Sequence, residues 1–291
     1  MRHILITGGT GTWGQEIVRQ LLELKATKRI VVYSRAERSQ EAMKRTIQDT
    51  RVEYILGDVC DSERINEAMI GIDTVFHTAA VKVIPNMEND CVYGYNINIY
   101  GTKNVVDAVI NNEVARCVLV STDKAVAPIN AYGVSKAAAE HIVKQAVKRY
   151  PGGEFRIVRS GNIIGSSGSV LPLWKESLIK NNVVTITVPT MTRFFTTKQE
   201  AVQRLLTVFE KPELIQALIS KGSSLGRLSE VAIRLWGDEY SRVMLIGNRG
   251  NEKMHEQILT TFDGDNRNYF SNDAEEYTIK ELMSIIREQR I

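Results

Sequence analysis

The stretch HILITGGTGTWGQEI, residues 3–17, decides the fold of this chain. Its opening HILIT predicts a buried strand. Gly8, Gly11 and Gly14 follow at spacings that allow a sharp turn, a close backbone approach to a pyrophosphate, and tight packing of a helix on the strand. A helix is expected from Gln15 to about Ala26, and the roughly half positive charge at its N-terminus favours phosphate groups. The stretch therefore predicts a dinucleotide-binding turn, with an ordinary glycine turn as the alternative.

Short β-branched runs and helical periods alternate outward from this turn through the first half of the chain. Strands that are apolar nearly throughout and are separated by helices predict a parallel sheet covered on both faces. We therefore expect an α/β fold with a Rossmann-like doubly wound parallel sheet. The strands are expected at residues 3–7, 29–34, 52–58, 73–79, 117–122 and 155–162, and the longer helices at 96–112 and 132–150.

The composition of the 291 residues is that of an ordinary globular protein, with 43% hydrophobic and 24% charged residues. The 37 basic and 34 acidic residues are interspersed and leave a net charge of +3, so no nucleic-acid partner is expected. No apolar run approaches the ~20 residues that span a bilayer, and Met1 precedes a strand rather than a signal peptide, so we expect no membrane segment and a cytoplasmic location. Three cysteines without a CxxC pair and four histidines without HExxH argue against disulfides and a metal site.

The end of the second expected strand indicates which dinucleotide binds. An NAD enzyme would present an acidic residue to the ribose hydroxyls there, whereas this chain has Ser34 and Arg35, with Arg38 close behind. A hydroxyl and guanidinium groups suit a ribose 2′-phosphate, so NADP is expected; the alternative is that both arginines are solvated charges at a helix start. Asp58 could accept a hydrogen bond from the adenine amino group, although an Asp in a turn needs no ligand. The residues expected to bind NADP are Gly8, Thr10, Gly11, Thr12, Trp13, Gly14, Ser34, Arg35, Arg38, Asp58, Val59, Ala79, Ala80, Lys82, Tyr132 and Lys136.

The regular alternation ends near residues 162–170, at a Gly/Ser loop. We expect residues 1–165 to form the NADP-binding Rossmann-like domain. Residues 166–291 are expected to be mainly a smaller substrate-binding region, from which a strand or helix could return to the first domain. Near the C-terminal end, Thr278 and Glu281 have the spacing of a capping box and predict a last helix.

Tyr132 and Lys136 lie four residues apart at the start of an expected helix, on one face of it and within reach of each other. An ammonium beside the phenol favours the tyrosinate, which can take a proton from a substrate hydroxyl while hydride leaves the adjacent carbon. The preceding strand ends in Ser121 and Thr122, so the threonine hydroxyl can share the same substrate oxygen. These residues predict an active site for hydride transfer.

Longer strings extend this pattern: TGGTGTWG, YSRAER, GDVCD, HTAAVKVIP, NIYGTKN, STDKAVAPINAYGVSK, VRSGN, GSSGSVLP and PTMTRFF. With them, the chain resembles the extended short-chain dehydrogenase/reductase superfamily, and within it the inverting UDP-N-acetylglucosamine 4,6-dehydratases that feed pseudaminic acid and related surface sugars. The resemblance runs from residue 3 to about 197 and resumes at 246–256. It implies an NADP-dependent enzyme that converts UDP-N-acetylglucosamine to a UDP-4-keto-6-deoxy-hexosamine with inversion at C5. It also implies a homo-oligomer formed through helices 96–112 and 132–150.

The resemblance assigns each residue of the site a role. Tyr132 would be the base at C4, with Lys136 as its partner and Thr122 beside it. Lys124 would take the C5 proton, and Asp123 would protonate the departing C6 hydroxyl. A ketone at C4 makes the C5 proton acidic, and Lys124 must be neutral to accept it, which requires burial and the nearby Lys136 ammonium to favour its neutral form. A turn-forming ion pair of Asp123 and Lys124 is the alternative.

The substrate-binding residues come from the same resemblance, in which Asn98 steadies the helix beside the site, Arg193 suits the diphosphate, and Glu256 suits the uridine ribose. Lys82 could instead be solvated, and Arg193 could be a rim ion pair. The residues expected to bind the UDP-sugar are Lys82, Asn98, Asn162, Arg193 and Glu256.

Two positions depart from the family pattern. Ser160 stands where an aromatic residue is usual, and Ser167 stands where an arginine is usual. The changes remove a packing surface and a phosphate contact, so the alternative function is a reductase or epimerase acting on a related UDP-4-keto or 5,6-ene sugar. A dinucleotide-binding regulator without catalysis is a further alternative. It predicts loss of Tyr132 or Lys136, and both are present.

Overall fold

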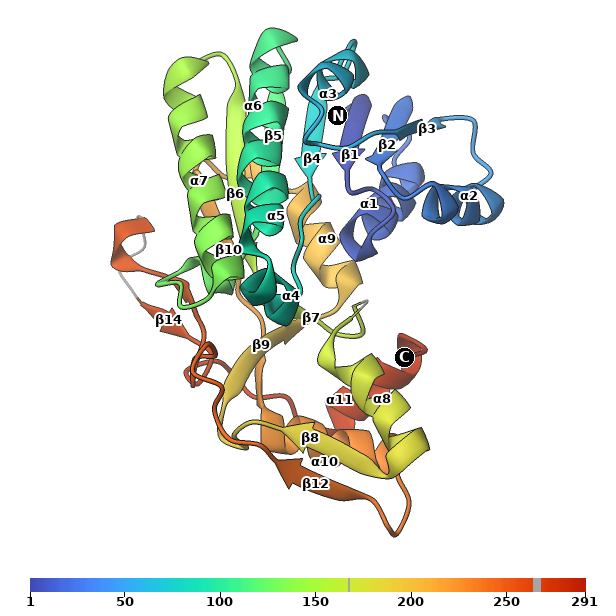
Figure 1. The fold of residues 1–291 in the computed structure, drawn as a ribbon. Coiled ribbons are helices and arrows are strands. Elements are labelled where there is room, and N and C mark those ends of the chain that lie inside the picture. The colour runs from blue at the N-terminus through green and yellow to red at the C-terminus, as the bar shows by residue number, and fades with distance from the viewer. Residues whose placement is uncertain (167, 264–267) are drawn as a thin grey trace. The chain divides into compact units, whose positions relative to one another are not determined.

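The computed structural model describes residues 1–166, 168–263 and 268–291, and these form two compact units (Figure 1). Unit 1 contains Met1–Arg159 and Val202–Gln216, and unit 2 contains Ser160–Ala201 and Ala217–Ile291. The chain therefore enters unit 2 a few residues before the expected boundary at 165, and the segment 202–216 belongs to the first unit. The assignment of cofactor binding to one unit and substrate binding to the other stays a prediction.

A seven-stranded sheet forms the centre of unit 1, in the order β10-β6-β5-β4-β1-β2-β3 (Figure 1). The pairs β3–β2, β2–β1, β1–β4 and β4–β5 are all parallel. The order reverses between β1 and β4, and in such sheets the crevice at the carboxyl ends of these strands takes the ligand. The expected Rossmann-like parallel sheet is confirmed. The strand bounds are β1 His3–Thr7, β2 Arg29–Ser34, β3 Val52–Leu56, β4 Thr74–His77, β5 Arg116–Thr122, β6 Glu154–Ser160 and β10 Ile215–Leu218.

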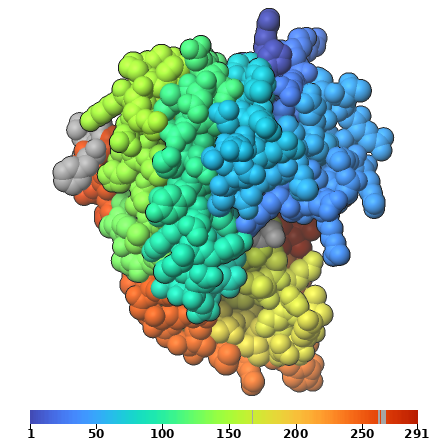
Figure 2. All heavy atoms as spheres, turned by 45° about the horizontal axis from the view of Figure 1, so that its top comes forward, coloured from blue at the N-terminus to red at the C-terminus, as the bar shows by residue number. Residues whose placement is uncertain are grey.

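Helices cover both faces of this sheet because successive strand residues point to opposite sides. Leu5 packs in one core with residues of α3, α6 and α7, whereas its fully buried neighbours Ile4 and Ile6 point to the opposite face. Figure 2 shows α6 and α7 side by side on the surface of unit 1, in the helix layer that covers one face of the sheet. Helix α9, Lys198–Leu206, begins in unit 2 and ends in unit 1. The other helices of unit 1 are α1 Thr12–Glu23, α2 Glu37–Thr46, α3 Ser62–Ala68, α4 Ile84–Asn89, α5 Cys91–Tyr95, α6 Gly101–Asn111 and α7 Ala131–Arg149, with 3₁₀ turns η2 Asp123–Ala125 and η3 Val208–Glu210.

The helix expected at 96–112 is present, but it begins with a π-helical turn, η1 Asn96–Tyr100, and continues as α6. Such wide turns insert one extra residue and often lie at functional sites. The next long helix, α7, starts where the sequence predicted, because the Asn130 side chain accepts a hydrogen bond from the backbone N–H of Gly133 and so satisfies one of the free donors of the first turn.

Within its described residues, unit 2 contains small sheets and the helices α8, α10 and α11. Its strands form a three-stranded sheet β11-β9-β7 and the pairs β12–β8 and β13–β14. Apolar side chains of α8, α10 and α11 pack in one core, and the predicted capping box of Thr278 and Glu281 is present at the start of α11. The bounds are β7 Asn162–Ile163, α8 Val170–Asn181, β8 Val183–Ile186, β9 Thr192–Thr196, β11 Gly222–Ser224, α10 Leu225–Trp236, β12 Arg242–Leu245, β13 Gln257–Leu259, η4 Thr261–Asp263, β14 Tyr269–Phe270 and α11 Ile279–Glu288.

Candidate active site

The glycine turn between β1 and α1 forms a backbone cradle. Gly8 adopts φ +66°, and a Cβ there would lie 2.8 Å from the backbone of Ala79. A Cβ at Gly14 would overlap the backbone of Gly9, whereas Gly11 is exposed and a Cβ there would approach only the Gly8 carbonyl. No side chain caps α1, and no acidic residue lies in its first turn. Its N–H groups are therefore suited to the phosphates of a dinucleotide.

The residues expected to bind the ribose and its 2′-phosphate lie at the end of β2 and in the segments that follow β2 and β3. The Arg35 guanidinium lies 3.4 Å from the Asp58 carboxylate and 5.7 Å from the centre of the Tyr93 ring. Ser34 is buried and accepts a hydrogen bond of 3.1 Å from Gln40. Arg38 is exposed in the first turn of α2. The structure thus brings Arg35 and Asp58 together, and part of the Arg35 charge faces this carboxylate.

The other predicted cofactor residues lie around the same strand ends. Thr10, Thr12 and Trp13 are partly exposed in the glycine turn, and Val59 is buried beyond β3. The segment after β4 is more open. Its predicted residues are Ala79, Ala80 and Lys82, of which the first is partly buried and the other two are exposed.

Thr122, Asp123, Lys124 and Tyr132 form a compact cluster at the end of β5. Asp123 is fully buried, and its Oδ1 accepts hydrogen bonds from the Thr122 hydroxyl at 2.9 Å and from Lys124 Nζ at 3.0 Å. Lys124 is largely buried too, with a side chain 15% exposed. The Thr122 side chain and the Asp123 and Lys124 charges all act on the pKa of the Tyr132 phenol. Four of the five predicted catalytic residues therefore lie close together.

Burial, the largest influence, and the Asp123 charge raise the pKa of Tyr132 to about 12 against the opposing effects of the Lys124 charge and the Thr122 side chain. The cation that favours the tyrosinate is therefore Lys124, whereas the sequence led us to expect Lys136. The reason is that Lys136 Nζ reaches the strand and donates a hydrogen bond of 2.8 Å to the Val120 carbonyl. Burial lowers the pKa of Lys136 to about 8, and Glu140 acts in the opposite direction.

A buried network that sequence reasoning missed lies next to Lys136. Glu140 accepts hydrogen bonds from the Ser121 hydroxyl at 2.6 Å and from Arg159 at 2.9 and 2.7 Å. A glutamate four residues after the lysine was visible in the sequence, but its partner on β6 was not, because nothing in the spacing links residues 140 and 159.

Asn98 lies in the π-helical turn and is almost fully buried. Its amide accepts from the Val81 N–H and donates to the Val81 carbonyl, both at 2.8 Å, and it also donates to Ser135 Oγ at 2.9 Å. These bonds tie the segment after β4 to α7. The steadying role expected of Asn98 has a physical basis here, whereas direct contact with a sugar would require the amide to leave these partners.

His77 connects the end of β1, just before the glycine turn, to helix α6. Its ring nitrogens lie 2.7 Å from the Thr7 hydroxyl and 2.9 Å from the Thr102 hydroxyl, which in turn donates to the Asn98 carbonyl at 2.6 Å. Burial lowers the pKa of His77 to about 3, and the Lys136 charge adds to this lowering of the pKa. The imidazole is therefore neutral at physiological pH.

Two predicted substrate residues of unit 2, Arg193 and Glu256, lie close to each other. Arg193 is buried on β9, with Nε 3.7 Å from the Glu256 carboxylate, and donates to the Thr192 carbonyl at 2.7 Å. Lys253 lies 3.6 Å from Glu256 as well. Asn162, on β7, pairs in register with Phe195 of β9. The structure brings Arg193 and Glu256 together in a buried ion pair, whereas the alternative reading of Arg193 was an ion pair at the rim of the site.

The two departures from the family pattern lie at the start of unit 2. Ser160 is buried, and its hydroxyl donates to the Gly161 carbonyl at 3.1 Å. A Cβ on Gly161 would overlap the Phe194 side chain, so a strand of unit 2 packs closely against this segment. Ser167 lies outside the described residues.

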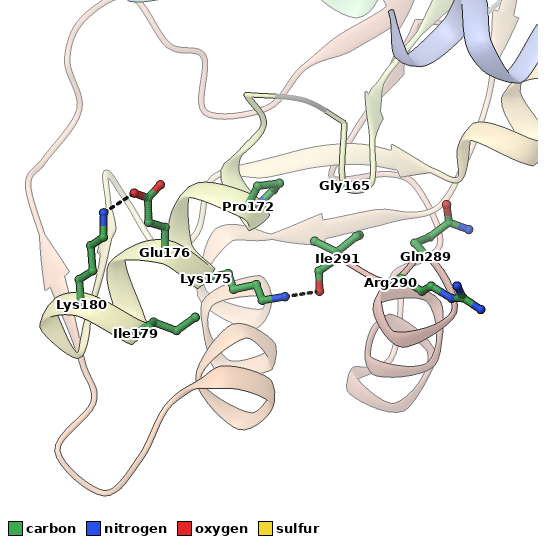
Figure 3. Close-up of a pocket in the computed structure, with 9 residues that line it drawn as sticks. All are labelled: Gly165, Pro172, Lys175, Glu176, Ile179, Lys180, Gln289, Arg290 and Ile291. Atoms are coloured by element: carbon green, nitrogen blue, oxygen red, sulfur yellow. Dashed lines mark hydrogen bonds and ion pairs between the residues drawn. The ribbon is translucent and has the colours of Figure 1, made fainter. Parts of the chain in front are cut away.

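A cavity of about 420 Å³ opens between α8 and the end of α11 (Figure 3). Lys175 Nζ reaches the Ile291 backbone oxygen at 2.9 Å across it, and Lys180 pairs with Glu176 at 2.6 Å on its rim. None of the nine described residues that line it belongs to the predicted cofactor or substrate sets. The cavity is therefore not part of a site predicted from the sequence.

Two further properties concern the described part of the chain. Within residues 1–166, 168–263 and 268–291, no helix combines the length and apolar composition that crossing a membrane requires. The same ranges contain no group of three or more His, Cys, Asp or Glu side chains arranged to hold a metal ion.

A parallel sheet with a glycine cradle, and a Tyr132–Lys136 helix beside it, define a protein of the extended short-chain dehydrogenase/reductase fold. Residues 4–278 match the family described as polysaccharide biosynthesis protein. The chain belongs to this family.

Individual relatives show how far the similarity extends. The UDP-glucose 4-epimerase of Rickettsia akari (strain Hartford) is 35% identical over 269 residues, which cover 90% of this chain and 79% of that protein. The structure of Pen from Bacillus thuringiensis is 29% identical, has a TM-score of 0.91, and covers 99% of this chain and 98% of its own. DesIV, a dTDP-glucose 4,6-dehydratase from Streptomyces venezuelae solved with NAD, has a TM-score of 0.83 at 20% identity. The match covers 100% of this chain and 97% of the DesIV chain. The last comparison concerns the fold alone.

Proposed function

We propose that this chain is an NADP-dependent nucleotide-sugar 4,6-dehydratase, which converts UDP-N-acetylglucosamine to a UDP-4-keto-6-deoxy-hexosamine with inversion at C5. The observation that carries the proposal is the buried Asp123–Lys124 pair in contact with Thr122 and near Tyr132. An epimerase or reductase needs a single acid–base group at C4. A dehydratase needs two more proton transfers, at C5 and C6, and this pair supplies a group for each.

The cofactor proposal rests on the glycine cradle. The N–H groups of α1 would hold the pyrophosphate, and Ser34, Arg35 and Arg38 would surround a ribose 2′-phosphate. A bound nicotinamide would supply the position that receives hydride from C4 of the sugar and returns it to C6. Dissociation constants for NADP⁺ and NAD⁺ test the preference. We expect Arg35→Gln to weaken NADP⁺ binding more than NAD⁺ binding, because only NADP⁺ carries the extra phosphate.

Tyr132 would take the proton of the C4 hydroxyl as a phenolate. Burial raises the pKa of the phenol to about 12, so the phenol must first release its own proton to solvent. Two groups favour the phenolate: the Lys124 charge, and the Thr122 hydroxyl once its hydrogen turns from Asp123 Oδ1 to the phenol oxygen. Thr122 would then donate a hydrogen bond to the same C4 oxygen as it becomes a carbonyl, which stabilises the negative charge that builds up during removal of the C5 proton.

Asp123 and Lys124 can reach their catalytic states through a single proton transfer. A hydrogen bond of 3.0 Å joins Lys124 Nζ to Asp123 Oδ1. After Tyr132 has taken the C4 proton and the Lys124 charge is no longer needed there, one proton moved along this bond gives a neutral amine and a protonated carboxyl. Burial favours this neutral pair because both charges lose hydration in the core. The amine then accepts the C5 proton, and the carboxyl gives its proton to the C6 hydroxyl, which leaves as water. A proton that has exchanged with solvent is finally added to C5 from the opposite face.

The substrate proposal assigns the nucleotide part of UDP-N-acetylglucosamine to unit 2. The Arg193 guanidinium can bind a diphosphate oxygen in a two-pronged manner, and Glu256 can accept hydrogen bonds from ribose hydroxyls. Asn162 and Lys82 are proposed to contact the UDP-sugar as well. Asn98 is proposed to act through its bonds to Val81 rather than through the sugar.

The reaction itself is tested by incubating the protein with UDP-N-acetylglucosamine and NADP⁺ in heavy water and following the sugar by NMR. We expect a C6 methyl group, deuterium at C5, and no net accumulation of NADPH. Asp123→Asn and Lys124→Met are expected to retain NADP⁺ binding and to lose the 6-deoxy product. Recovery of unchanged sugar without deuterium at C5 would contradict the proposal.

The second candidate is a UDP-sugar 4-epimerase, and the names of the Rickettsia relatives favour it. An epimerase gives a C4 epimer with an intact C6 hydroxymethyl group and no deuterium at C5, so the same NMR experiment separates the two functions. In that case Asp123 and Lys124 would be a structural ion pair, and their substitution would leave the product unchanged.

The assembly and cellular location of the protein stay predictions. A homo-oligomer through α6 and α7 is proposed because large apolar side chains on and before these helices are exposed, among them Val92 at 65%, Tyr100 at 60% and Val134 at 43%. Exposed apolar surface of this kind is typical of subunit interfaces. Light scattering of the purified protein measures the oligomeric state. The proposed location is the cytoplasm.

A further inference from the structure

Three polar side chains from three different elements meet inside the core of unit 1. Ser121 lies at the end of β5, Glu140 on α7 and Arg159 on β6, and each is at most 5% exposed. The Ser121 hydroxyl donates to Glu140 Oε1 at 2.6 Å. Arg159 donates from Nε to the same oxygen at 2.9 Å and from Nη2 to Oε2 at 2.7 Å. The carboxylate thus holds both β5 and β6 against α7.

The same helix and strand are joined a second time, one helical turn earlier. Lys136 Nζ donates to the Val120 carbonyl at 2.8 Å. Two consecutive residues of β5 are therefore connected to two α7 residues four positions apart, which lie on one face of the helix. A slip of α7 along β5 would break both connections at once.

We propose that Ser121, Glu140 and Arg159 form a positioning network for Lys136. The network fixes the turn of α7 that carries the amine, and Glu140 supplies the negative charge that this buried amine faces. This inference rests on the proposed function only for its kinetic consequences. The charge and position of Lys136 are measurable without a substrate.

The charge argument depends on what surrounds Lys136. Burial disfavours the charged form of its amine, and the Glu140 charge favours that form. The His77 imidazole on β4 is neutral at physiological pH and contributes no charge. Other charged or titratable groups among the described residues of the packed elements include Tyr132 on α7, Asp123 and Lys124 on η2, and Arg159 on β6.

Burying the Glu140–Arg159 pair costs desolvation free energy, and a purely structural role does not explain why the pair is there. Burying an ion pair removes two charges from water, and apolar side chains of similar volume often hold a fold equally well. Arg159 neutralises Glu140 in a two-pronged contact, so the carboxylate can stay ionised in the core. An ionised Glu140 is what the buried amine of Lys136 requires.

The test compares an apolar replacement with an isosteric one. Ser121→Ala/Glu140→Leu/Arg159→Met removes every polar group of the network together, so none is left unpaired. Glu140→Gln removes only the charge. Each variant is labelled with ¹³C-lysine, and the Lys136 signal, assigned with Lys136→Arg, is titrated by NMR. Arg149→Gln is the matched control, because it removes the Arg149–Asp107 ion pair, 2.8 Å long, from the exposed end of the same helix.

We expect the Lys136 titration to move down by about 1–3 pH units in both Glu140 variants, and to stay unchanged in Arg149→Gln. With a nucleotide-sugar substrate, kcat should fall at least about tenfold at neutral pH with KM little changed, and the alkaline limb of the kcat profile should move to lower pH. Ser121→Ala keeps the ion pair and is expected to lower kcat without moving the titration, which tests the positioning even where a charge variant does not fold.

Wild-type titration of Lys136 together with wild-type kcat in the folded triple variant would overturn the proposal, and so would wild-type kcat in Ser121→Ala. The outcomes also separate this inference from the proposed function. A protein inactive on every nucleotide sugar, in which Glu140→Gln still moves the Lys136 titration, would contradict the function and leave the network's role at Lys136 standing.

Discussion

The two units of this chain differ in how closely each candidate site depends on regular structure. In unit 1 the candidate residues stand at the carboxyl ends of parallel strands and at the starts of the following helices, as Thr122 does on β5 and Tyr132 on α7. In unit 2 they stand on short strands and loops, as Arg193 does on the five-residue β9 and Glu256 just before β13. Repeated β–α units therefore place chemistry predictably, whereas small mixed sheets place it by contacts that only the folded chain defines.

The comparison assigns different kinetic parameters to the two units. In the proposed function, unit 1 would supply the groups that move protons, so changes there should reduce kcat. Unit 2 contributes groups suited to a nucleotide, so changes there should raise KM. The two predictions on activity below test this division, and the two on stability test how strictly the sequence dictates the packing of unit 1.

The largest effect is expected for Tyr132→Phe, which removes the proposed base and keeps the ring. We expect kcat for the nucleotide sugar to fall by about 10²–10⁴-fold with KM little changed. The control is Tyr240→Phe, because Tyr240 is 73% exposed in unit 2. Steady-state kinetics on both variants measure the effect, and activity within twofold of wild type in Tyr132→Phe would remove the tyrosine from the mechanism.

A smaller effect of a different kind is expected for Arg193→Lys. The lysine keeps the positive charge but loses the planar fork that binds a diphosphate through two hydrogen bonds. We expect KM to rise by about 10–100-fold, equivalent to about 1.4–2.8 kcal/mol of binding. Arg234→Lys on the exposed face of α10 is the control. A fall in kcat at constant KM would show that the division between the units is drawn in the wrong place.

Gly14→Ala tests the packing of the glycine turn. An added Cβ would overlap the Gly9 backbone, and backbone yields less easily than a flexible side chain. We expect the free energy of unfolding to fall by about 1–3 kcal/mol, measured by urea denaturation. Gly152→Ala is the control, because its Cβ would meet only the Tyr150 ring, at 3.5 Å. Equal stability of the two variants would mean that the turn can relax.

The smallest effect is expected from His77 at acid pH. Burial lowers its pKa from 6.5 to about 3, so the unfolded chain takes up a proton at a pH where the folded chain does not. Stability from this group is complete above pH 6.5 and is lost as the pH falls toward 3. Between pH 8 and pH 5.5 the loss is about 1.4 kcal/mol.

His77→Gln should lack this part of the acid sensitivity, as measured by urea denaturation at both pH values. His141→Gln, at an exposed position on α7, is the control and should behave as wild type. If all three proteins lost the same stability between the two pH values, the imidazole would not be the group responsible.

The sequence predicted most of unit 1 because its signals are local. β1 and β2 have the expected bounds, since apolar runs next to glycine or polar residues mark both ends. The helix after the glycine turn starts at Thr12 rather than at the expected Gln15, because the turn itself supplies the first helical residues. The contact of Thr122 with Asp123, and of Asp123 with Lys124, also follows from neighbouring positions in the chain.

Contacts between distant residues could not be predicted in the same way. The bond from Lys136 to the Val120 carbonyl involves a backbone atom, which leaves no mark in the sequence. The Glu140–Arg159 pair joins an α-helix to a strand, so its spacing follows no helical or strand period. In unit 2 the strands span two to five residues, too few for a periodic pattern, so only the family resemblance pointed to Arg193 and Glu256.

The wide turn at Asn96–Tyr100 makes this helix sensitive to a change in length. Each residue of a helix turns the chain by about 100°, so a one-residue deletion that restored regular pitch would swing Asn98 away from the Val81 backbone and from Ser135. No single substitution produces that rotation. Gain or loss of one codon here would therefore be a more severe change than most exchanges of one amino acid for another, and homologues of different length at this point should hold the segment after β4 in a different way.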